Sequence, residues 1–208
     1  MTGTRITALD PSTYGRTPWK NGGGVVIDIA GELREGAASA AGWDATLWRF
    51  GRTTIPVAAP FSDLTGFERL LMVIGGRGLV LRTPTEEIDV RAPFTAVRFT
   101  GEAGIVSRLE SGAVEVVNLI AHRAYATIDL ERLASDDSKA LASGIHVLYA
   151  AAGDCELRLG AARRALAGGH ALRIDGGGGS DGDLRCLTGT LVVASVFPGA
   201  SPGFTARA

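Results

Sequence analysis

Three polar residues fall in phase with apolar strand positions, and their types suit the binding of an anion. Period-two alternation puts each of Arg49, Arg69 and Asn118 on a strand face with apolar residues, as with Leu71 near Arg69 and Val116 near Asn118. Burying such polar groups without a partner is costly, so their phase indicates a polar pocket. A guanidinium presents a rigid fork of donors that fits a carboxylate, and an asparagine adds a donor and an acceptor. The three residues therefore predict a site for a small organic anion.

An ordinary structural role for the same residues is the alternative. In that case Arg49 pairs with Asp44 or Glu68 in an ion pair, and Asn118 bonds the backbone at a bulge. The phase of the residues alone favours this structural role.

The spacing of histidines and cysteines does not suit a metal centre. His122, His146 and His170 are each separated by more than twenty residues, so no two have the close spacing of ligands on one strand. Cys155 and Cys186 do not complete a site, and two cysteines are too few for a disulfide framework. We therefore expect no metal, no other cofactor and no catalytic residue.

Composition and charge describe an ordinary globular protein. The 208 residues are 46% hydrophobic and 21% charged, and the formal net charge of −1 offers no attraction to nucleic acid or to an anionic membrane. The N-terminus has no apolar signal region, and no stretch approaches the roughly 18 apolar residues of a membrane span. We expect a cytoplasmic protein with neither a nucleic-acid nor a membrane partner.

Glycine separates short apolar runs along the chain, a pattern typical of turns between strands in an all-β fold. The first group of expected strands comprises residues 25–29, 45–50, 67–74, 78–82, 95–99, 104–109 and 113–121. The second group comprises residues 145–151, 155–159, 170–174, 184–187 and 190–197. Between the groups, residues 130–143 mix charged and apolar residues as a surface helix or linker does.

Each group contains a pattern of apolar strand, glycine turn and apolar strand. Residues 70–81 and 146–157 both show it, and they resemble the central hairpin of cupin barrels. The chain is accordingly divided into a first barrel at 1–135 and a smaller second barrel at 136–208, with exchange of strands between them left open.

One glycine-rich segment carries a more specific resemblance. Residues 18–24, Pro-Trp-Lys-Asn-Gly-Gly-Gly, precede an expected strand, and further motifs follow in order at 48–49, 60–62, 66–69, 93–94, 99–101, 118–119 and 123. This ordered set resembles the HutD/Ves family over about residues 5–130. The resemblance implies a bicupin fold of two jelly-roll barrels and an association with histidine utilisation, without an established catalytic activity. Carried over residue by residue, it implies a ligand site made of Trp19, Lys20, Asn21, Arg49, Phe61, Ser62, Arg69, Asn118 and Arg123.

Two functional hypotheses follow. The favoured one is a non-catalytic, regulatory protein that binds a small carboxylated metabolite of histidine degradation, such as formylglutamate or a urocanate-like compound. The alternative is a metal-free cupin-type isomerase or epimerase acting on a small acid or sugar, for which Glu68, His122 and Tyr125 are the candidate bases. A purely structural module is a third possibility, and the second barrel could be a brace, a second site or the interface of a homodimer.

Overall fold

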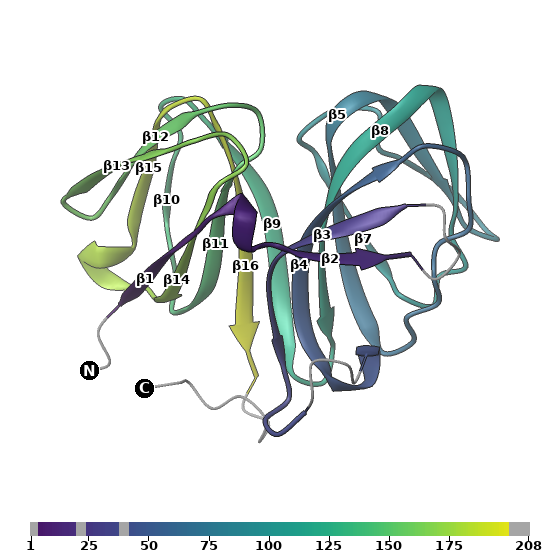
Figure 1. Ribbon diagram of the computed structural model, residues 1–208, viewed down its shortest axis with the longest axis horizontal. Helices are drawn as coiled ribbons and strands as arrows, with labels where there is room; N and C mark the ends of the chain where they lie inside the picture. The colour runs from purple at the N-terminus through teal and green to yellow at the C-terminus, as the bar shows by residue number, and fades with distance from the viewer. Residues whose placement is uncertain (1–3, 20–23, 38–41, 200–208) are drawn as a thin grey trace. The chain divides into compact units, whose positions relative to one another are not determined.

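The chain folds almost entirely into strands. The computed structural model describes residues 4–19, 24–37 and 42–199 (Figure 1). Apart from three short 3-10 helices, Pro11–Thr13, Gly42–Ala45 and Gly179–Gly182, the regular elements in these ranges are strands, which confirms the predicted all-β class. None of the helices described there has the length and apolar character needed to cross a membrane.

The described residues form two compact units. The large unit comprises residues 15–128 with 198–199, and the small unit comprises residues 4–14 with 129–197. The expected domains, 1–135 and 136–208, differ from these units in three places. The first strand of the chain pairs with a strand near residue 174, the change from one unit to the other comes after Ile128, and residues 198–199 belong to the large unit.

The large unit is built on a seven-stranded antiparallel sheet. Its strands run β2-β3-β4-β8-β5-β6 in space, and β7 pairs with β5. The strands are β2 (Gly15–Pro18), β3 (Val25–Leu33), β4 (Thr46–Ile55), β5 (Phe67–Arg82), β6 (Glu87–Asp89), β7 (Ala96–Thr100) and β8 (Val106–His122).

The small unit contains a five-stranded sheet, β1-β14-β11-β16-β9, and a four-stranded sheet, β10-β15-β12-β13. Its strands are β1 (Arg5–Leu9), β9 (Ala126–Ala134), β10 (Ser138–Ala140), β11 (Gly144–Ala150), β12 (Cys155–Leu159), β13 (Ala162–Leu166), β14 (Ala171–Gly176), β15 (Asp183–Thr188) and β16 (Thr190–Pro198). The prediction of a helix or linker at 130–143 is wrong, because β9 and β10 occupy most of it. Ala126, Ile128 and Leu130 are buried at every second position, which is the period of a strand.

The glycine turn predicted near residue 75 is also wrong. Strand β5 continues through it for 16 residues, and its register with β8 shifts between Val73 and Gly75 and again between Gly75 and Arg77. Gly76 has φ +85°, and a Cβ there would lie 2.4 Å from the carbonyl oxygen of Ala113. The glycines therefore make an irregularity that bends two long paired strands.

One face of strands β4, β5 and β8 carries the main apolar cluster of the large unit, and we call it the core face. Ile55, Leu71, Val73, Val114 and Val116 alternate along these strands and pack in one cluster. Because the side chains of a strand alternate between its two faces, Arg49, Arg69 and Asn118 belong to this face too.

Candidate functional site

Arg69 lies on the core face in the middle of the large unit. Strand β5 places it opposite Ile120 of β8 on one side and Phe99 of β7 on the other. The residue is only 8% exposed. The apolar residues that precede and follow it on this face, Phe67 and Leu71, fix the strand register and with it the inward direction of the guanidinium.

The guanidinium of Arg69 packs against two adjacent aromatic rings. Its central carbon lies 4.9 Å from the ring centre of Phe61 and 5.1 Å from that of Phe99. Its Nη2 donates to Oδ1 of Asn118 at 3.3 Å, whereas its Nε is buried without a hydrogen-bond partner. No acidic side chain among the described residues forms an ion pair with it. Burial lowers the pKa of Arg69 to about 10, so the group stays charged at neutral pH.

Asn118 sits one row along the core face from Arg69. Strand β8 pairs it with Leu71 on β5 and with Gly51 on β4, so its side chain lies diagonal to that of Arg69. The hydrogen bond between them fixes the amide with its oxygen toward the guanidinium. The structure thus brings Arg69 and Asn118 together.

Arg49 lies in the same row of the core face as Arg69, because Ile120 of β8 pairs with Arg49 on one side and with Arg69 on the other. Its Nε donates to Oδ1 of Asp28, and its guanidinium lies 5.5 Å from the ring centre of Trp43. An ion pair therefore exists, but its acid is Asp28 of β3 and not Asp44 or Glu68. The Nη2 atom of Arg49 is buried and has no hydrogen-bond partner.

A small cavity of about 70 Å³ opens beside Arg69, large enough to admit a carboxylate group. Two loops shape it, held by the hydrogen bonds from the Phe61 N–H to the Ile105 oxygen and from the Leu64 N–H to the Gly101 oxygen, at 2.8 and 3.0 Å. Gly101 is required there, because a Cβ would lie 2.0 Å from the Leu64 oxygen. The lining residues are Phe61, Ser62, Asp63, Arg69, Phe99, Thr100, Gly101, Glu102, Gly104 and Ile105.

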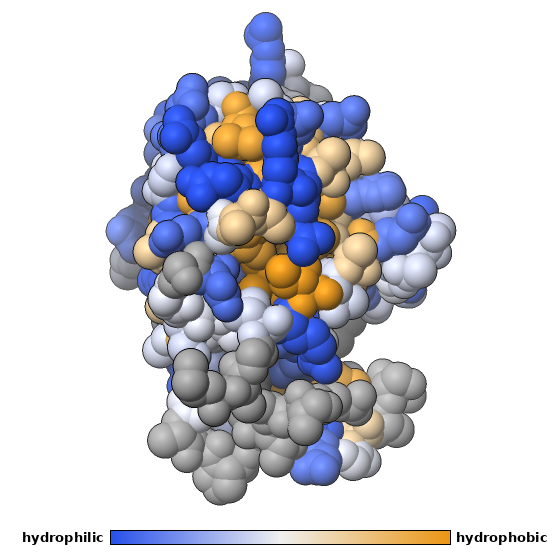
Figure 2. Space-filling view, turned by 90° about the vertical axis from the view of Figure 1, so that its left-hand side faces the viewer, coloured by the Kyte–Doolittle hydropathy of each residue, from blue (hydrophilic) through white to orange (hydrophobic). Residues whose placement is uncertain are grey.

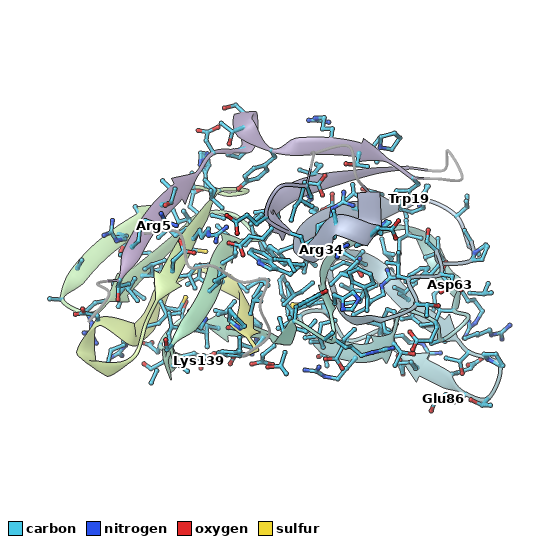
Figure 3. The ribbon with its side chains drawn as sticks, turned by 90° about the horizontal axis from the view of Figure 1, so that it is seen from below. Arg5, Trp19, Arg34, Asp63, Glu86 and Lys139 are labelled. Atoms are coloured by element: carbon cyan, nitrogen blue, oxygen red, sulfur yellow. The ribbon has the colours of Figure 1, made fainter. Side chains whose placement is uncertain are left out.

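Trp19 closes another part of the same apolar cluster. Its indole N–H donates to Oγ1 of Thr53 at 3.1 Å, and that hydroxyl donates to the Val25 oxygen at 2.8 Å. Its ring packs over Gly24, where a Cβ would lie 3.0 Å away. Figure 3 labels Trp19 and the exposed loop residue Asp63 in the large unit. Lys20 and Asn21, predicted to join Trp19 at the ligand site, lie outside the described residues.

The chain is similar to known proteins in both sequence and fold. A family model described as HutD matches residues 11–190. The chain belongs to the HutD family. A curated relative, an uncharacterized 21.2 kDa protein in the hutC 3′ region of Pseudomonas putida, is 32% identical over 117 residues. That match covers 56% of this chain and 58% of the relative, so the chain spans little more than half of that protein's length.

Two solved structures resemble the whole HutD-family chain. HutD from Pseudomonas fluorescens SBW25 has a TM-score of 0.77 at 24% identity, and the match covers 94% of this chain and 100% of that one. A conserved protein of unknown function from Pseudomonas aeruginosa PAO1 has a TM-score of 0.76 at 25% identity, with the same coverage of both chains. The first likeness establishes a shared fold.

Arg123, expected to contact an anion directly, is already engaged. Its two Nη atoms donate to both carboxylate oxygens of Glu102, at 3.2 and 2.5 Å, and Nη1 also donates to the Phe67 oxygen at 3.1 Å. This ion pair lowers the pKa of the Glu102 carboxyl. Because Glu102 lines the cavity, Arg123 reaches the site through Glu102 in this HutD-family chain.

The three candidate bases of the enzyme hypothesis do not converge on Arg69. Glu68 lies on the opposite face of β5 and pairs with Arg98 at 2.5 Å. His122 packs against the rings of Phe67 and Tyr125, with centroids 5.0 and 4.8 Å away. Among the residues that the structure describes, no group of three or more His, Cys, Asp or Glu side chains is arranged to hold a metal ion.

The small unit has a shallow hollow on its four-stranded sheet, of about 230 Å³. Two of the three cations that line it have acidic partners, since Lys139 pairs with Asp129 at 3.3 Å and Arg185 pairs with Asp136 at 2.9 Å, whereas Arg158 donates to the Gly160 oxygen at 2.9 Å. On the face shown in Figure 2, hydrophilic and hydrophobic residues are intermingled.

Sequence reasoning did not assign four of the residues around the site. Asp28, Trp43, Phe99 and Glu102 orient or cover the arginines but were not among the predicted contacts. Phe99 had a usable signal, because it shares the phase of Val97 on an expected strand. The positions of Asp28, Trp43 and Glu102 depend on pairing across the sheet or on contacts between loops. The periodicity of a single strand does not reveal such contacts.

Proposed function

We propose that this HutD-family chain binds a small carboxylated metabolite at Arg69 and acts as a non-catalytic, regulatory protein. The observation that carries the proposal is the buried guanidinium of Arg69, which has aromatic walls and an amide neighbour but no acidic partner among the described residues. A buried charge without a counter-charge is strongly unfavourable unless something compensates it. A ligand carboxylate that enters the adjacent cavity would supply that compensation.

The surroundings of Arg69 suit a carboxylate better than they suit water. The rings of Phe61 and Phe99 pack against the guanidinium and make this part of its surroundings apolar. The Ser62 hydroxyl is a further possible donor on the cavity wall. Charge-assisted bonds from arginine to carboxylate are short and roughly twice as strong as neutral ones, and low local polarity strengthens them.

The family suggests which metabolites to test. The HutD name and the position of the Pseudomonas putida relative beside hutC support a ligand from histidine degradation, with formylglutamate and a urocanate-like acid as the candidates. We further propose that the two units are cupin-type barrels of a bicupin. In support, the large unit is one antiparallel sheet bent by glycine irregularities, and the small unit has two sheets.

Calorimetric titration of the purified protein with each candidate tests the binding. The expected result is saturable binding. In unfolding measurements with ligand at one hundred times its dissociation constant, the free energy of unfolding should rise by about 2.7 kcal/mol. Arg69→Gln is expected to abolish binding, whereas Arg82→Gln, an exposed arginine of the same strand, leaves it unchanged. Loss of binding in both variants, or in neither, would contradict the role of Arg69.

The non-catalytic part of the proposal needs its own measurement. Nuclear magnetic resonance spectra of the bound candidate, recorded over hours with excess ligand, are expected to show the compound unchanged. Turnover that stops in Glu68→Gln or His122→Gln would establish the enzyme hypothesis instead.

A further inference from the structure

We infer that Arg123 is a positioning residue, which holds the carboxylate of Glu102 away from Arg69 and so keeps the guanidinium of Arg69 free for a ligand. The inference rests on the proposed function, because it concerns the same site. Arg69 and Glu102 both line the cavity of about 70 Å³, whereas Arg123 is not among the described residues that line it. An acid thus lies on the wall beside a buried cation, and the two form no ion pair.

The small size of the cavity brings the two charges within reach of each other. Its volume of about 70 Å³ corresponds to about two water molecules, so little more than one small group separates the residues on its walls. Strand β7 pairs Phe99 with Arg69, and Glu102 follows Phe99 by three residues. Because Arg69 is buried, solvent screens its charge poorly and a nearby acid is strongly attracted to it. An unrestrained Glu102 side chain would therefore turn toward Arg69.

Arg123 supplies the restraint. Its N–H donates to the Gly66 oxygen at 3.0 Å, and its Nη1 donates to the Phe67 oxygen at 3.1 Å, so the start of β5 fixes both its backbone and its guanidinium. From this position its two Nη atoms bond both carboxylate oxygens of Glu102. The backbone N–H groups of Gly66 and of Glu102 itself also stabilise the carboxylate. Glu102 therefore has a complete set of partners on the side of Arg123.

The second acid on the cavity wall is restrained in another way. Oδ1 of Asp63 accepts from the N–H of Thr65 at 2.9 Å and from its Oγ1 at 2.8 Å. These donors are neutral and lie in the same loop as Asp63, so they do not depend on Arg123. Removing Arg123 should therefore release Glu102 alone, and Asp63 provides a matched control.

Titration calorimetry with formylglutamate and with urocanate tests the inference. In Arg123→Gln, the affinity for the compound that the wild-type protein binds should fall about tenfold or more, because the ligand must first displace Glu102 from Arg69. The double variant Arg123→Gln/Glu102→Gln should recover an affinity within about twofold of wild type, since a neutral amide competes weakly for a guanidinium. Arg123→Gln/Asp63→Asn should remain weak. Neither a structural loss nor a lost direct contact between Arg123 and the ligand would be repaired by the second substitution at Glu102.

Unfolding of the ligand-free protein gives a second readout. In the Arg123→Gln background, Glu102→Gln should lower the midpoint of urea unfolding, because it removes the new ion pair with Arg69. The same substitution should cause no such shift when Arg69→Met is also present.

The outcomes separate this inference from the proposed function. Equal affinity of wild type and Arg123→Gln would overturn the role of Arg123 and leave the Arg69 site standing. A loss of affinity that Glu102→Gln does not restore would do the same. If the wild-type protein binds neither compound, the proposed function fails, and the unfolding experiment decides the inference alone. Absence of coupling between Glu102 and Arg69 in the Arg123→Gln background would then overturn it.

Discussion

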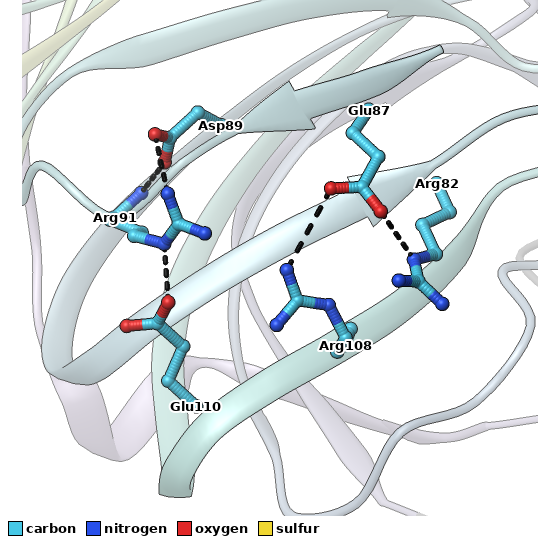
Figure 4. A network of polar contacts seen from close by, with 6 residues as sticks. All are labelled: Arg82, Glu87, Asp89, Arg91, Arg108 and Glu110. Atoms are coloured by element: carbon cyan, nitrogen blue, oxygen red, sulfur yellow. Dashed lines mark hydrogen bonds and ion pairs between the residues drawn. The ribbon is translucent and has the colours of Figure 1, made fainter. Parts of the chain in front are cut away.

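Strand β5 carries arginines in two opposite situations. Near its end, Arg82 joins an exposed network on β5, β6 and β8 in which every arginine has an acid within 4 Å (Figure 4). The network consists of Arg82, Glu87, Asp89, Arg91, Arg108 and Glu110. Near the start of the strand, Arg69 is buried against two rings and forms no ion pair with an acid among the described residues. On this strand, the exposed Arg82 has an acidic partner, whereas the buried Arg69 has none among the described residues. That contrast supports the proposal that a ligand compensates the charge of Arg69.

Removing one of the rings should break the buried site most severely. Phe99→Ala deletes a buried side chain that touches both Arg69 and Phe61, and it should lower the free energy of unfolding by about 3–5 kcal/mol. Urea unfolding followed by circular dichroism measures it. Phe99→Leu, which keeps the volume but not the ring, should cost much less, and equal losses in the two variants would show that the ring itself matters.

Replacing Arg69 by an apolar residue of similar length should separate stability from binding. Arg69→Met removes the uncompensated buried charge, so the ligand-free protein should become about 1–3 kcal/mol more stable while ligand binding is lost. The same substitution at Arg82 should produce neither change. Calorimetric melting with and without ligand provides both readouts, and a destabilised Arg69→Met variant would mean that the charge is already compensated within the chain.

A buried group with complete partners should behave differently, and His146 provides the case. It is fully buried, its Nδ1 lies 2.9 Å from the Ser195 hydroxyl, and its Nε2 lies 2.8 Å from the Ala142 oxygen. Burial lowers the pKa of His146, so below about pH 6.5 the unfolded chain binds a proton more tightly than the folded protein does. The free energy of unfolding should therefore fall with decreasing pH in that window, by up to about 1.4 kcal/mol per pH unit. In His146→Gln the slope should be shallower, and parallel curves for the two proteins would assign the acid sensitivity to other groups.

The exposed network should give the smallest effect. Arg82→Gln breaks the 2.7 Å contact with Glu87, and both side chains are about half exposed, at 55% and 50%. The expected change in the free energy of unfolding is below about 1 kcal/mol and should shrink as salt is added. Melting at low and high ionic strength checks this. A large, salt-independent loss would remove the contrast with Arg69.

Strand periodicity predicted the orientation of Arg69 and Asn118 better than it predicted the elements around them. The phase of each residue with its apolar neighbours indicated that it points inward, and the structure joins the two by a hydrogen bond. The partner of Arg49 was not predictable, because Asp28 reaches it from β3, which pairs with β4 through register irregularities. The turn expected at Gly75 failed for a related reason, because a glycine in an apolar run marks a bend in a paired strand as readily as a reversal. Residues 130–143 were predicted to be a surface helix or linker because their charges obscured the period-two burial of β9.

The pairing of β1 with β14 has a consequence for the order in which the protein is made. Strand β1 (Arg5–Leu9) pairs with residues 171–175 of β14. During translation, β1 therefore cannot pair until most of the small unit has been synthesised. The large unit is almost continuous in sequence, from 15 to 128, and can assemble during synthesis. The arrangement around Arg69 can therefore form before translation of the small unit is finished.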